Sequence, residues 1–594
     1  MSKHFLNTPG TLVQDALKGL EITNSDIKLD VKHKVVYLRN QDTERVALIS
    51  GGGSGHEPAH SGFVGNGMLS AAVCGNIFAS PNPGQVLRAL ELVNNPKGTV
   101  IIVKNYTGDI LNFGLAREKF SALYPDQAFS IRFVVVADDV AVGRSQGAIV
   151  GRRGLAGTVL VYKIAAALAK KGGTLDEVEV LARCIASRVG TIGVGLGHCH
   201  VPGTQSEATL KVDEYEIGMG IHNEPGHRKS SPIPPLNTLV EEMVEMLTST
   251  SDPERSFLDL KHDKEDCIVL MVNNLGGTSE LELAALAGAA VLEVKRRGFV
   301  IDRILIGTFM TSLNMPGVSL TLLLLPRPND DTQFSKADIL RYLDEETDVL
   351  AWKMAIKLHP RENEGHVGGG TVDSSEQLKQ MDHRILMKDD SFIRAVKAAC
   401  KAIHDAEPEI TSMDQIAGDG DCGLTLKTGA DAVSKAISEG LISGRNLIED
   451  VRVVAQVIEE SMDGTSGALY SIFFSALAKA LYEAASTSNV SAGRELAADT
   501  LKTALDRLYT YTRARPPSRT LIDPLDAFIR ALNAGKAWKA AALLAGQAAE
   551  STKSLPAKVG RAAYVEQKNL NAVCDPGAWS VKTILEAACS VIPE

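Results

Sequence analysis

The sequence lacks a long hydrophobic run. Its longest apolar stretch, residues 318–325, is interrupted by Ser319 and Thr321, and it is far shorter than the ~20 residues that a membrane helix needs. The first residues lack the apolar core of a signal peptide, and the last residues carry no organelle-retention tag. These absences predict a cytoplasmic protein with no membrane partner.

Paired cysteines and an excess of basic residues are also lacking. The eight cysteines show no CxxC spacing, which argues against a disulfide framework or a zinc ribbon. The 62 Lys and Arg residues are outnumbered by 72 Asp and Glu residues, for a net charge of -10, so nucleic acid is an unfavourable partner. The 44% hydrophobic and 23% charged content of these 594 residues is typical of a globular protein with a sizeable core.

The first half of the chain repeats a strand, loop and helix pattern. β-Branched runs at residues 46–50, 99–103, 131–136 and 267–272 each precede a Gly-rich, acidic or Asn-rich loop. Such units build a parallel or mixed α/β sheet, and ligands of these sheets sit beyond the carboxyl ends of the strands. Residues 339–357 have a further helix-like pattern. The loops are therefore expected near a crevice.

The composition and the hydrophobic pattern of the sequence change after this half. Residues 361–377 are polar and contain four glycines, which is typical of an exposed linker. Beyond about Lys388, Ala-rich amphipathic stretches at residues 393–403, 469–485 and 537–549 replace the β-branched runs. We therefore predict an α/β part over residues 1–357, a linker over residues 358–387 and a helical part over residues 388–594.

The first candidate site is the Gly-rich stretch that runs from Gly51 into His56. The following letters, His56 to His60, satisfy the zinc-protease pattern HExxH, but Pro58 belongs in the first turn of a helix, which leaves no helical face for both histidines. The glycines instead offer bare backbone N–H groups before a predicted helix N-terminus, suited to a small polar or phosphorylated ligand. A plain structural loop is an equally good interpretation.

The second candidate site contains Asp414, Asp419 and Asp421. Three carboxylates so close together repel one another unless a cation lies among them, and hard oxygen ligands suit Mg²⁺ or Ca²⁺. The glycines between the acids favour a metal site over a solvated acidic turn. The spacing differs from that of an EF-hand.

The third candidate site is the start of a long apolar helix at Gly464, where Thr465 or Ser466 is expected to cap the helix. Capping explains these residues, but a helix N-terminus also binds phosphate. Together with the acidic residues it indicates ATP. Residues 575–578 are either a plain turn before a helix or a further wall of the same site.

Four motifs together identify the family that this chain resembles. Residues 51–58, 104–109, 218–226 and 418–423 resemble, in this order, the motifs of the single-chain ATP-dependent dihydroxyacetone kinases. The resemblance covers essentially the whole chain. It implies an α/β ketone-binding domain of two α/β subdomains, followed by an all-α, eight-helix nucleotide-binding domain.

The resemblance also implies roles for residues in the first half. The family binds its ketone covalently as a hemiaminal on a histidine nitrogen, and the matching residue is His222. Asp109 matches the residue that accepts the proton of the attacking hydroxyl, and His56 matches the one that polarises the carbonyl. Residues implied to line this pocket are Gly53, Ser54, Gly55 and Lys104.

In the second half, the resemblance makes Asp414, Asp419 and Asp421 the ligands of Mg²⁺ that holds ATP. Further residues implied to bind ATP are Gly420, Cys422, Thr465, Ser466, Arg519, Thr520, Asp575, Pro576 and Gly577. Family members resemble homodimers. The predicted reaction is ATP-dependent phosphorylation of dihydroxyacetone and of D-glyceraldehyde. The alternatives are an FAD-cyclising lyase that uses the same nucleotide site, a non-catalytic ketone sensor, and a metalloprotease.

Overall fold

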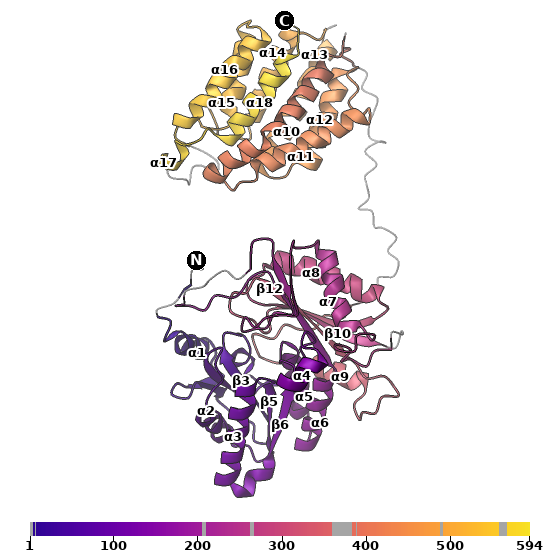
Figure 1. The fold of residues 1–594 in the computed structure, drawn as a ribbon. Helices are drawn as coiled ribbons and strands as arrows, with labels where there is room; N and C mark the ends of the chain where they lie inside the picture. The colour runs from indigo at the N-terminus through magenta and orange to yellow at the C-terminus, as the bar shows by residue number, and fades with distance from the viewer. Residues whose placement is uncertain are drawn as a thin grey trace. The chain divides into compact units, whose positions relative to one another are not determined.

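The computed structural model describes residues 4–5, 8–204, 210–261, 266–358, 383–387, 389–487, 491–557 and 567–593. The chain divides into two compact units, Met1–Asn363 and Glu364–Glu594 (Figure 1). Within the predicted linker, residues 358–387, residues 359–382 lie outside the described residues, and the predicted domain boundaries stay predictions. No helix in the described ranges combines the length and the apolar character needed to cross a membrane.

The first unit contains two six-stranded sheets. In the first sheet the strand order is β1 (Ile27–Asp30), β2 (Val35–Leu38), β4 (Ala71–Ile77), β3 (Ala47–Ser54), β5 (Thr99–Lys104) and β6 (Ile131–Val136). β3 pairs in parallel with both β4 and β5, and β5 pairs in parallel with β6, whereas β1 and β2 are antiparallel. The predicted mixed sheet is confirmed.

The second sheet has the order β11 (Val300–Gly307), β10 (Cys267–Asn274), β12 (Gly317–Leu324), β7 (Val189–Gly195), β8 (Tyr215–Ile217) and β9 (Arg228–Ser230). Only the β10 and β11 pair is parallel. β8 and β9 form a short hairpin at one edge. The loop of this hairpin carries His222, so the edge of the second sheet positions one candidate functional residue.

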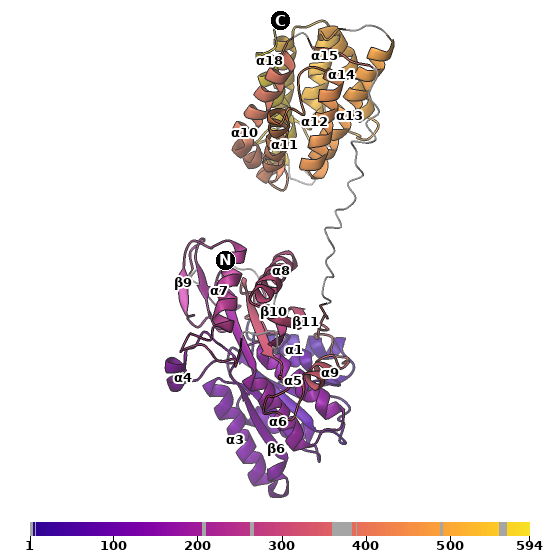
Figure 2. The same ribbon diagram turned by 90° about the vertical axis from the view of Figure 1, so that its right-hand side faces the viewer.

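Helices cover both sheets of the first unit. They are α1 (Leu12–Thr23), α2 (Pro83–Val93), α3 (Thr107–Leu123), α4 (Arg144–Val150), α5 (Gly157–Lys170), α6 (Leu175–Ser187), α7 (Leu236–Thr248), α8 (Glu280–Arg296) and α9 (Lys336–Leu343), with the 3-10 turns η1 (Ser61–Phe63) and η2 (Pro125–Ser130). α2 and α3 pack on one face of the first sheet. α7 and α8 pack on one face of the second (Figure 2).

α5 joins the two sheets into one body. Thirteen of its fourteen residues are buried, and a helix that is apolar all round belongs in an interior. One continuous core cluster contains α5, Leu48 and Ile102 of the first sheet, and Met271 and Leu305 of the second. The two α/β subdomains therefore share a core.

The second unit is helical. Its long helices are α10 (Ser391–Ala417), α11 (Cys422–Ser438), α12 (Leu447–Ser461), α13 (Gly464–Thr487), α14 (Arg494–Leu508), α15 (Ile522–Asn533), α16 (Trp538–Ser551) and α18 (Pro576–Ser590), with the short α17 (Gln567–Leu570) and η3 (Thr552–Ser554). No β-strand occurs in the part of this unit that the structure describes. The predicted eight-helix domain is confirmed.

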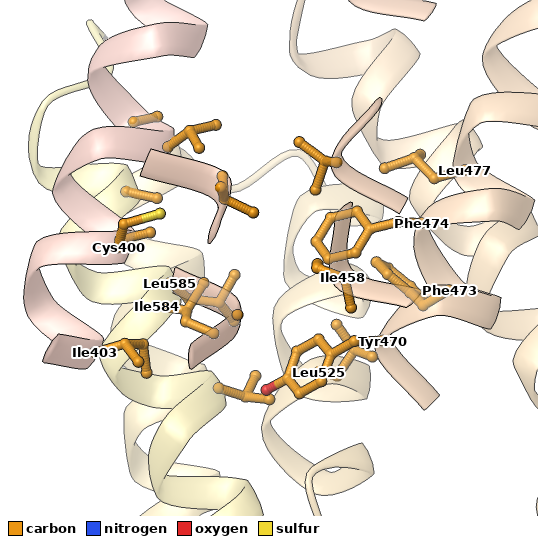
Figure 3. A pocket seen from close by; sticks show the side chains of 18 of the residues that line it. Cys400, Ile403, Ile458, Tyr470, Phe473, Phe474, Leu477, Leu525, Ile584 and Leu585 are labelled. Atoms are coloured by element: carbon orange, nitrogen blue, oxygen red, sulfur yellow. The ribbon is translucent and has the colours of Figure 1, made fainter. Parts of the chain in front are cut away.

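The helices of the second unit line an apolar cavity of about 340 Å³ that is partly open. Figure 3 shows Cys400 and Ile403 of α10 and Ile584 of α18 on one side, and Phe473 and Phe474 of α13 on the other. A cavity of this size without polar walls does not hold ordered water. The helical core is thus less completely filled than a typical protein interior.

Two local predictions are wrong. The Gly-rich stretch is not a loop before a helix, because Gly51–Ser54 belongs to β3 and residues 57–60 form a turn. The predicted helix over residues 339–357 ends at Leu343, since the main chain of Ile356 instead pairs with Ile304 of β11 as an isolated bridge. In both places pairing with neighbouring strands overrides the local pattern.

Candidate active site

His222 lies in the loop between β8 and β9, and its side chain is 18% exposed. Its main-chain N–H donates to Glu224 Oε2 at 2.8 Å, and its ring Nδ1 donates to Glu224 Oε1 at 2.7 Å. Burial raises the pKa of Glu224, but the bonds from His222 outweigh this effect and lower it to about 2. Glu224 is therefore a carboxylate that orients the ring.

His56 follows β3 and meets His222 directly. The two Nε2 atoms lie 3.0 Å apart, and His56 Nδ1 lies 2.8 Å from the carbonyl oxygen of Thr311. His56 is fully buried, and burial together with the charge of Lys104 lowers its pKa well below the usual value. His60 turns elsewhere, to Ser50 at 3.2 Å. The two histidines of HExxH thus share no helical face, which excludes the zinc-protease hypothesis.

Lys104 and Asp109 bring charge into the same buried region. Lys104 ends β5 and is 1% exposed, and Asp109 lies in the first turn of α3 and is 3% exposed. Burial raises the pKa of Asp109 while Lys104 lowers it in part. The oxygen Oδ1 of Asp109 is buried and has no hydrogen-bond partner within the described ranges. It is thus available to a ligand hydroxyl.

The glycines of β3 allow this close packing. A Cβ on Gly53 would lie 2.8 Å from the backbone of Phe78 and Ala79, and one on Gly52 would lie 3.3 Å from Asp109 Oδ2. The Gly55 main-chain N–H donates to the carboxylate of Glu57, and Ser54 Oγ donates to the Gly75 carbonyl. The glycines therefore matter for close approach. The predicted role of exposed N–H groups at a helix N-terminus is wrong.

Aromatic rings enclose the histidine pair. Phe78 stacks on His56 with a centroid distance of 5.3 Å, and both Phe78 and Tyr106 meet His222 edge to face at 5.1 and 4.7 Å. The Tyr106 hydroxyl is buried without a partner among the residues described. These rings shield His56 from water, whereas the His222 side chain stays 18% exposed.

Four residues that contact the histidine pair were not predicted from the sequence: Glu224, Thr311, Phe78 and Tyr106. Glu224 lies inside the quoted motif, two residues after His222, and a carboxylate at that spacing in a Gly- and Pro-rich turn is a usable signal for a ring partner. Thr311 contributes only its main-chain carbonyl, so no side-chain pattern could have revealed it.

The acidic residues of the second unit come together as predicted. One carboxylate oxygen from each of Asp414, Asp419 and Asp421 lies within 4.8 Å of the others, with Asp414 buried and the other two exposed. Asp414 belongs to the last turn of α10 rather than to the loop, and its Oδ2 accepts the N–H groups of Gly420 and Cys422 at 3.0 Å. This donor set of hard oxygens fits Mg²⁺.

Three further residues that the resemblance implies in ATP binding lie close to this triad: Cys422, Ser466 and Asp575. The thiol of Cys422 lies near Asp414, Asp575 and Ser466. Burial, and next the negative charges of Asp414 and Asp575, raise the pKa of this thiol to about 12. Asp575 caps α18 by accepting the N–H of Ala578, with Pro576 and Gly577 in the first turn. Burial raises the pKa of Asp575 to about 6. The triad, the start of α13 and the start of α18 therefore form one region.

α13 begins at Gly464, so Thr465 and Ser466 are its second and third residues and not its cap. A groove of about 920 Å³ runs from this start along α13; residues lining it include Gly467, Ser471, Lys479 and Tyr511. Ser471 Oγ is buried there without a partner in the described part of the chain. Four acidic residues also line this groove against two basic ones, so its charge does not favour an anion; they are Glu459, Asp463, Glu483 and Asp506 against Lys479 and Arg507.

Arg519 and Thr520 lie in the segment before α15. Arg519 is fully buried, donates Nη2 to the carbonyls of Leu570 and Val573, and approaches Asp575 Oδ2 to 3.8 Å. Its Nε and Nη1 atoms have no hydrogen-bond partner among the described residues. The Thr520 main-chain N–H donates to Asp523. Arg519 thus adds positive charge beside the acidic region, whereas Thr520 shapes the turn.

The chain matches known proteins over its whole length. The Dak1 domain matches residues 18–351 and the DAK2 domain residues 416–590. Dihydroxyacetone kinase 2 of Saccharomyces cerevisiae is 41% identical and the match covers 99% of each chain; the Triokinase/FMN cyclase of Mus musculus is 38% identical, with 100% of this chain and 99% of that protein covered.

Among solved structures, the dihydroxyacetone kinase from C. freundii in complex with AMP-PNP and Mg²⁺ aligns with a TM-score of 0.62 and 30% identity, over 99% of this chain and 100% of that chain. The matches extend over the α/β unit and the helical unit alike. The chain is therefore a kinase that belongs to the dihydroxyacetone kinase family.

Proposed function

We propose that this kinase transfers the γ-phosphoryl group of ATP to dihydroxyacetone and to D-glyceraldehyde. The observation that carries the proposal is the His222 ring, whose Nδ1 is held by Glu224 while its Nε2 points at His56 among buried side chains. The name of the Saccharomyces cerevisiae relative supports dihydroxyacetone, and the motif resemblance supports both substrates. A nucleophilic imidazole selects carbonyl compounds, because an alcohol such as glycerol has no electrophilic carbon.

The ketone is held covalently in this proposal. The lone pair of His222 Nε2 forms a bond to the carbonyl carbon, the C=O π bond breaks, and the oxygen takes up a proton to become the hydroxyl of a hemiaminal. His56, whose Nε2 lies 3.0 Å from His222 Nε2, is expected to polarise this oxygen, with the charge of Lys104 nearby, and Gly53 lets the pocket walls approach closely. Phosphoryl transfer then needs a base, and Asp109, with an unpartnered buried oxygen, accepts the proton of the attacking hydroxyl.

ATP is held by the second unit. Asp414, Asp419 and Asp421 would bind Mg²⁺, which would offset the charge of the phosphates. The first turn of α13 is expected to bind the phosphate groups, and Arg519 adds positive charge beside Asp575. The AMP-PNP and Mg²⁺ of the C. freundii complex support this nucleotide site.

Coupled-assay turnover with ATP and Mg²⁺ tests the reaction. Dihydroxyacetone is expected to be phosphorylated and glycerol is not, and equal rates on both would refute the covalent step. His222→Ala is expected to remove the protein adduct seen by intact-mass spectrometry after trapping. An unchanged adduct in that variant would place the nucleophile elsewhere.

A second candidate function is FAD cyclisation with release of AMP. The name of the Mus musculus relative, Triokinase/FMN cyclase, favours it. This reaction uses the nucleotide unit without His222. His222→Ala is therefore expected to abolish ketone phosphorylation and leave any cyclase rate unchanged, as followed by chromatography of the flavin products.

A non-catalytic ketone sensor is not favoured, because the chain matches kinases over both units. We further propose that the kinase is a cytoplasmic homodimer. Light scattering after size-exclusion chromatography tests the dimer directly.

A further inference from the structure

The ring nitrogens of His56 and His222 belong to one chain of hydrogen bonds, which begins at the Thr311 carbonyl and ends at the Glu224 carboxylate. The carbonyl oxygen of Thr311 only accepts hydrogen bonds, so His56 Nδ1 carries a hydrogen. The Glu224 carboxylate also only accepts, so His222 Nδ1 carries one too. Both outer nitrogens are therefore protonated.

The two inner nitrogens then face each other at 3.0 Å. With a hydrogen on each Nδ1, two neutral rings would set lone pair against lone pair at that distance. A hydrogen bond requires one further proton between the Nε2 atoms, which gives the pair of rings one positive charge. The carboxylate of Glu224 lies on the His222 side of this charge.

Other charged groups around the pair come from separate elements. The charge of Lys104 of β5 interacts electrostatically with His56 and with Glu224, and the carboxylate of Asp109 of α3 interacts electrostatically with Lys104. His60 lies in the turn after β3. Glu224 is the one among these that the structure places in contact with His222 through both of its oxygens. It is thus the group best placed to hold the positive charge at His222.

We propose that Glu224 is a positioning residue that fixes His222 with a hydrogen on Nδ1, so that Nε2 becomes the nucleophile and the proton shared with His56 passes to the substrate oxygen. This inference rests on the proposed function, because it assigns the source of the proton in the hemiaminal step. In the same way, the Thr311 carbonyl oxygen fixes His56 with a hydrogen on Nδ1.

The step balances in atoms and charge. The shared proton moves to His56 Nε2, which frees the lone pair of His222 Nε2. As the N–C bond forms and the C=O π bond breaks, the carbonyl oxygen takes this proton from His56. The positive charge of the pair ends on the substituted His222 ring, next to the Glu224 carboxylate, and His56 is left neutral.

The surroundings of His56 suit this transfer. Burial and the charge of Lys104 lower the pKa of His56, so a proton on its Nε2 is held weakly and is readily passed to a developing alkoxide. Phe78 contacts both rings and Tyr106 contacts His222, and these walls limit exchange of the proton with water.

The test compares two Glu→Gln substitutions on one hairpin. Glu224→Gln keeps the size of the side chain, but it removes the charge and replaces one of the two acceptor oxygens with an NH₂ donor. Glu216→Gln is the matched control, because Glu216 also supports this loop, accepting the N–H of Gly226, without contacting His222. Adduct formation with dihydroxyacetone is followed by intact mass, and ¹⁵N NMR of histidine-labelled full-length protein reports the tautomer of His222.

Glu224→Gln is expected to lower kcat/KM for dihydroxyacetone by ~10² to 10⁴-fold. It is also expected to shift His222 away from the Nδ1–H tautomer, because replacing the Asp of a Ser-His-Asp triad by Asn has this effect on the histidine. Glu216→Gln is expected to stay within a few-fold, and Glu224→Asp to recover part of the loss. Glu224→Gln that matches Glu216→Gln in adduct formation, or that keeps the Nδ1–H tautomer, overturns the inference.

The two proposals fail separately. A His222→Ala variant that keeps the adduct refutes the proposed covalent step itself. A His222→Ala variant that loses the adduct, beside a Glu224→Gln variant that forms it at the wild-type rate, refutes only the role of Glu224.

Discussion

The two units of this kinase treat charge in opposite ways. In the α/β unit, Lys104, Asp109 and His56 are each no more than 3% exposed, and aromatic rings contact Lys104 and His56. In the helical unit, Asp419 and Asp421 lie at the surface, and only Asp414 of the triad is buried. One unit hides its reactive groups from water, whereas the other presents its carboxylates to it.

This difference matches the chemistry proposed for each unit. A covalent bond to a carbonyl carbon depends on the proton state of a few groups, and burial fixes those states. A Mg²⁺ ion keeps several waters and binds through substrate phosphates as well as carboxylates, so exposed acids suit it. Substitutions of buried and exposed acids should therefore have different consequences.

The largest effect is expected from Asp109→Asn in the buried site. Loss of the proposed base should lower kcat by ~10² to 10⁴-fold, while binding of Mg²⁺ and AMP-PNP stays unchanged because Asp109 belongs to the other unit. Steady-state kinetics and calorimetry measure the two quantities. Glu118→Gln, at an exposed position of the same helix, is the control. Near-normal turnover of Asp109→Asn would mean that another group is the base.

The sequence predicted the elements that local pattern determines. The strand runs became β3, β5, β6 and β10, and the Ala-rich stretches became α10, α13 and α16, because alternation and helical periodicity follow directly from which residues must be buried. The acidic triad was also predictable, since three carboxylates within eight residues repel one another unless a cation lies among them.

What the sequence did not reveal depends on distant partners. Gly51–Ser54 pairs with β4 and β5, which turned an expected loop into a strand. Ile356 pairs with Ile304, which ended an expected helix early. The contact of His56 with Thr311 spans 255 positions, and a main-chain carbonyl leaves no trace in a side-chain pattern.

A stability effect of about 3 kcal/mol is expected from Asp575→Asn. The folded-state pKa of Asp575 is raised from 3.8 to about 6. Its contribution to stability is therefore fully present below about pH 4 and is lost as the pH rises through 6. Asn caps a helix as well as Asp does, so the variant should raise the unfolding free energy of the helical unit above pH 6.

Scanning calorimetry of the full chain at pH 5 and pH 8 measures this effect. The gain in melting temperature should be larger at pH 8, and Asp463→Asn, at an exposed position before α13, should change little at either pH. Equal gains at both pH values would contradict the raised pKa of Asp575.

Within the triad, burial should separate two otherwise similar substitutions. Asp421→Asn is expected to weaken binding of Mg²⁺ with AMP-PNP by ~10-fold or more without loss of stability, since the side chain is exposed. Asp414→Asn should weaken binding and also destabilise the unit by ~1 to 3 kcal/mol, because its Oδ2 holds the N–H groups of Gly420 and Cys422. Calorimetric titration and thermal unfolding give both values, with the exposed Asp431→Asn as control.

The smallest effect compares the packing of the two units through one substitution made in each. Cys400 faces the cavity of about 340 Å³ in the helical unit (Figure 3), whereas Cys74 of β4 is buried in the continuous core around α5. Cys400→Leu should raise the unfolding free energy by ~1 kcal/mol, because the larger side chain fills empty apolar space. Cys74→Leu should lower it by ~1 to 3 kcal/mol, because no space is available. Opposite shifts of the two thermal transitions would confirm the difference in packing. A loss of stability in Cys400→Leu would mean that the helices around the cavity do not tolerate a larger side chain and that the cavity is not simple empty space.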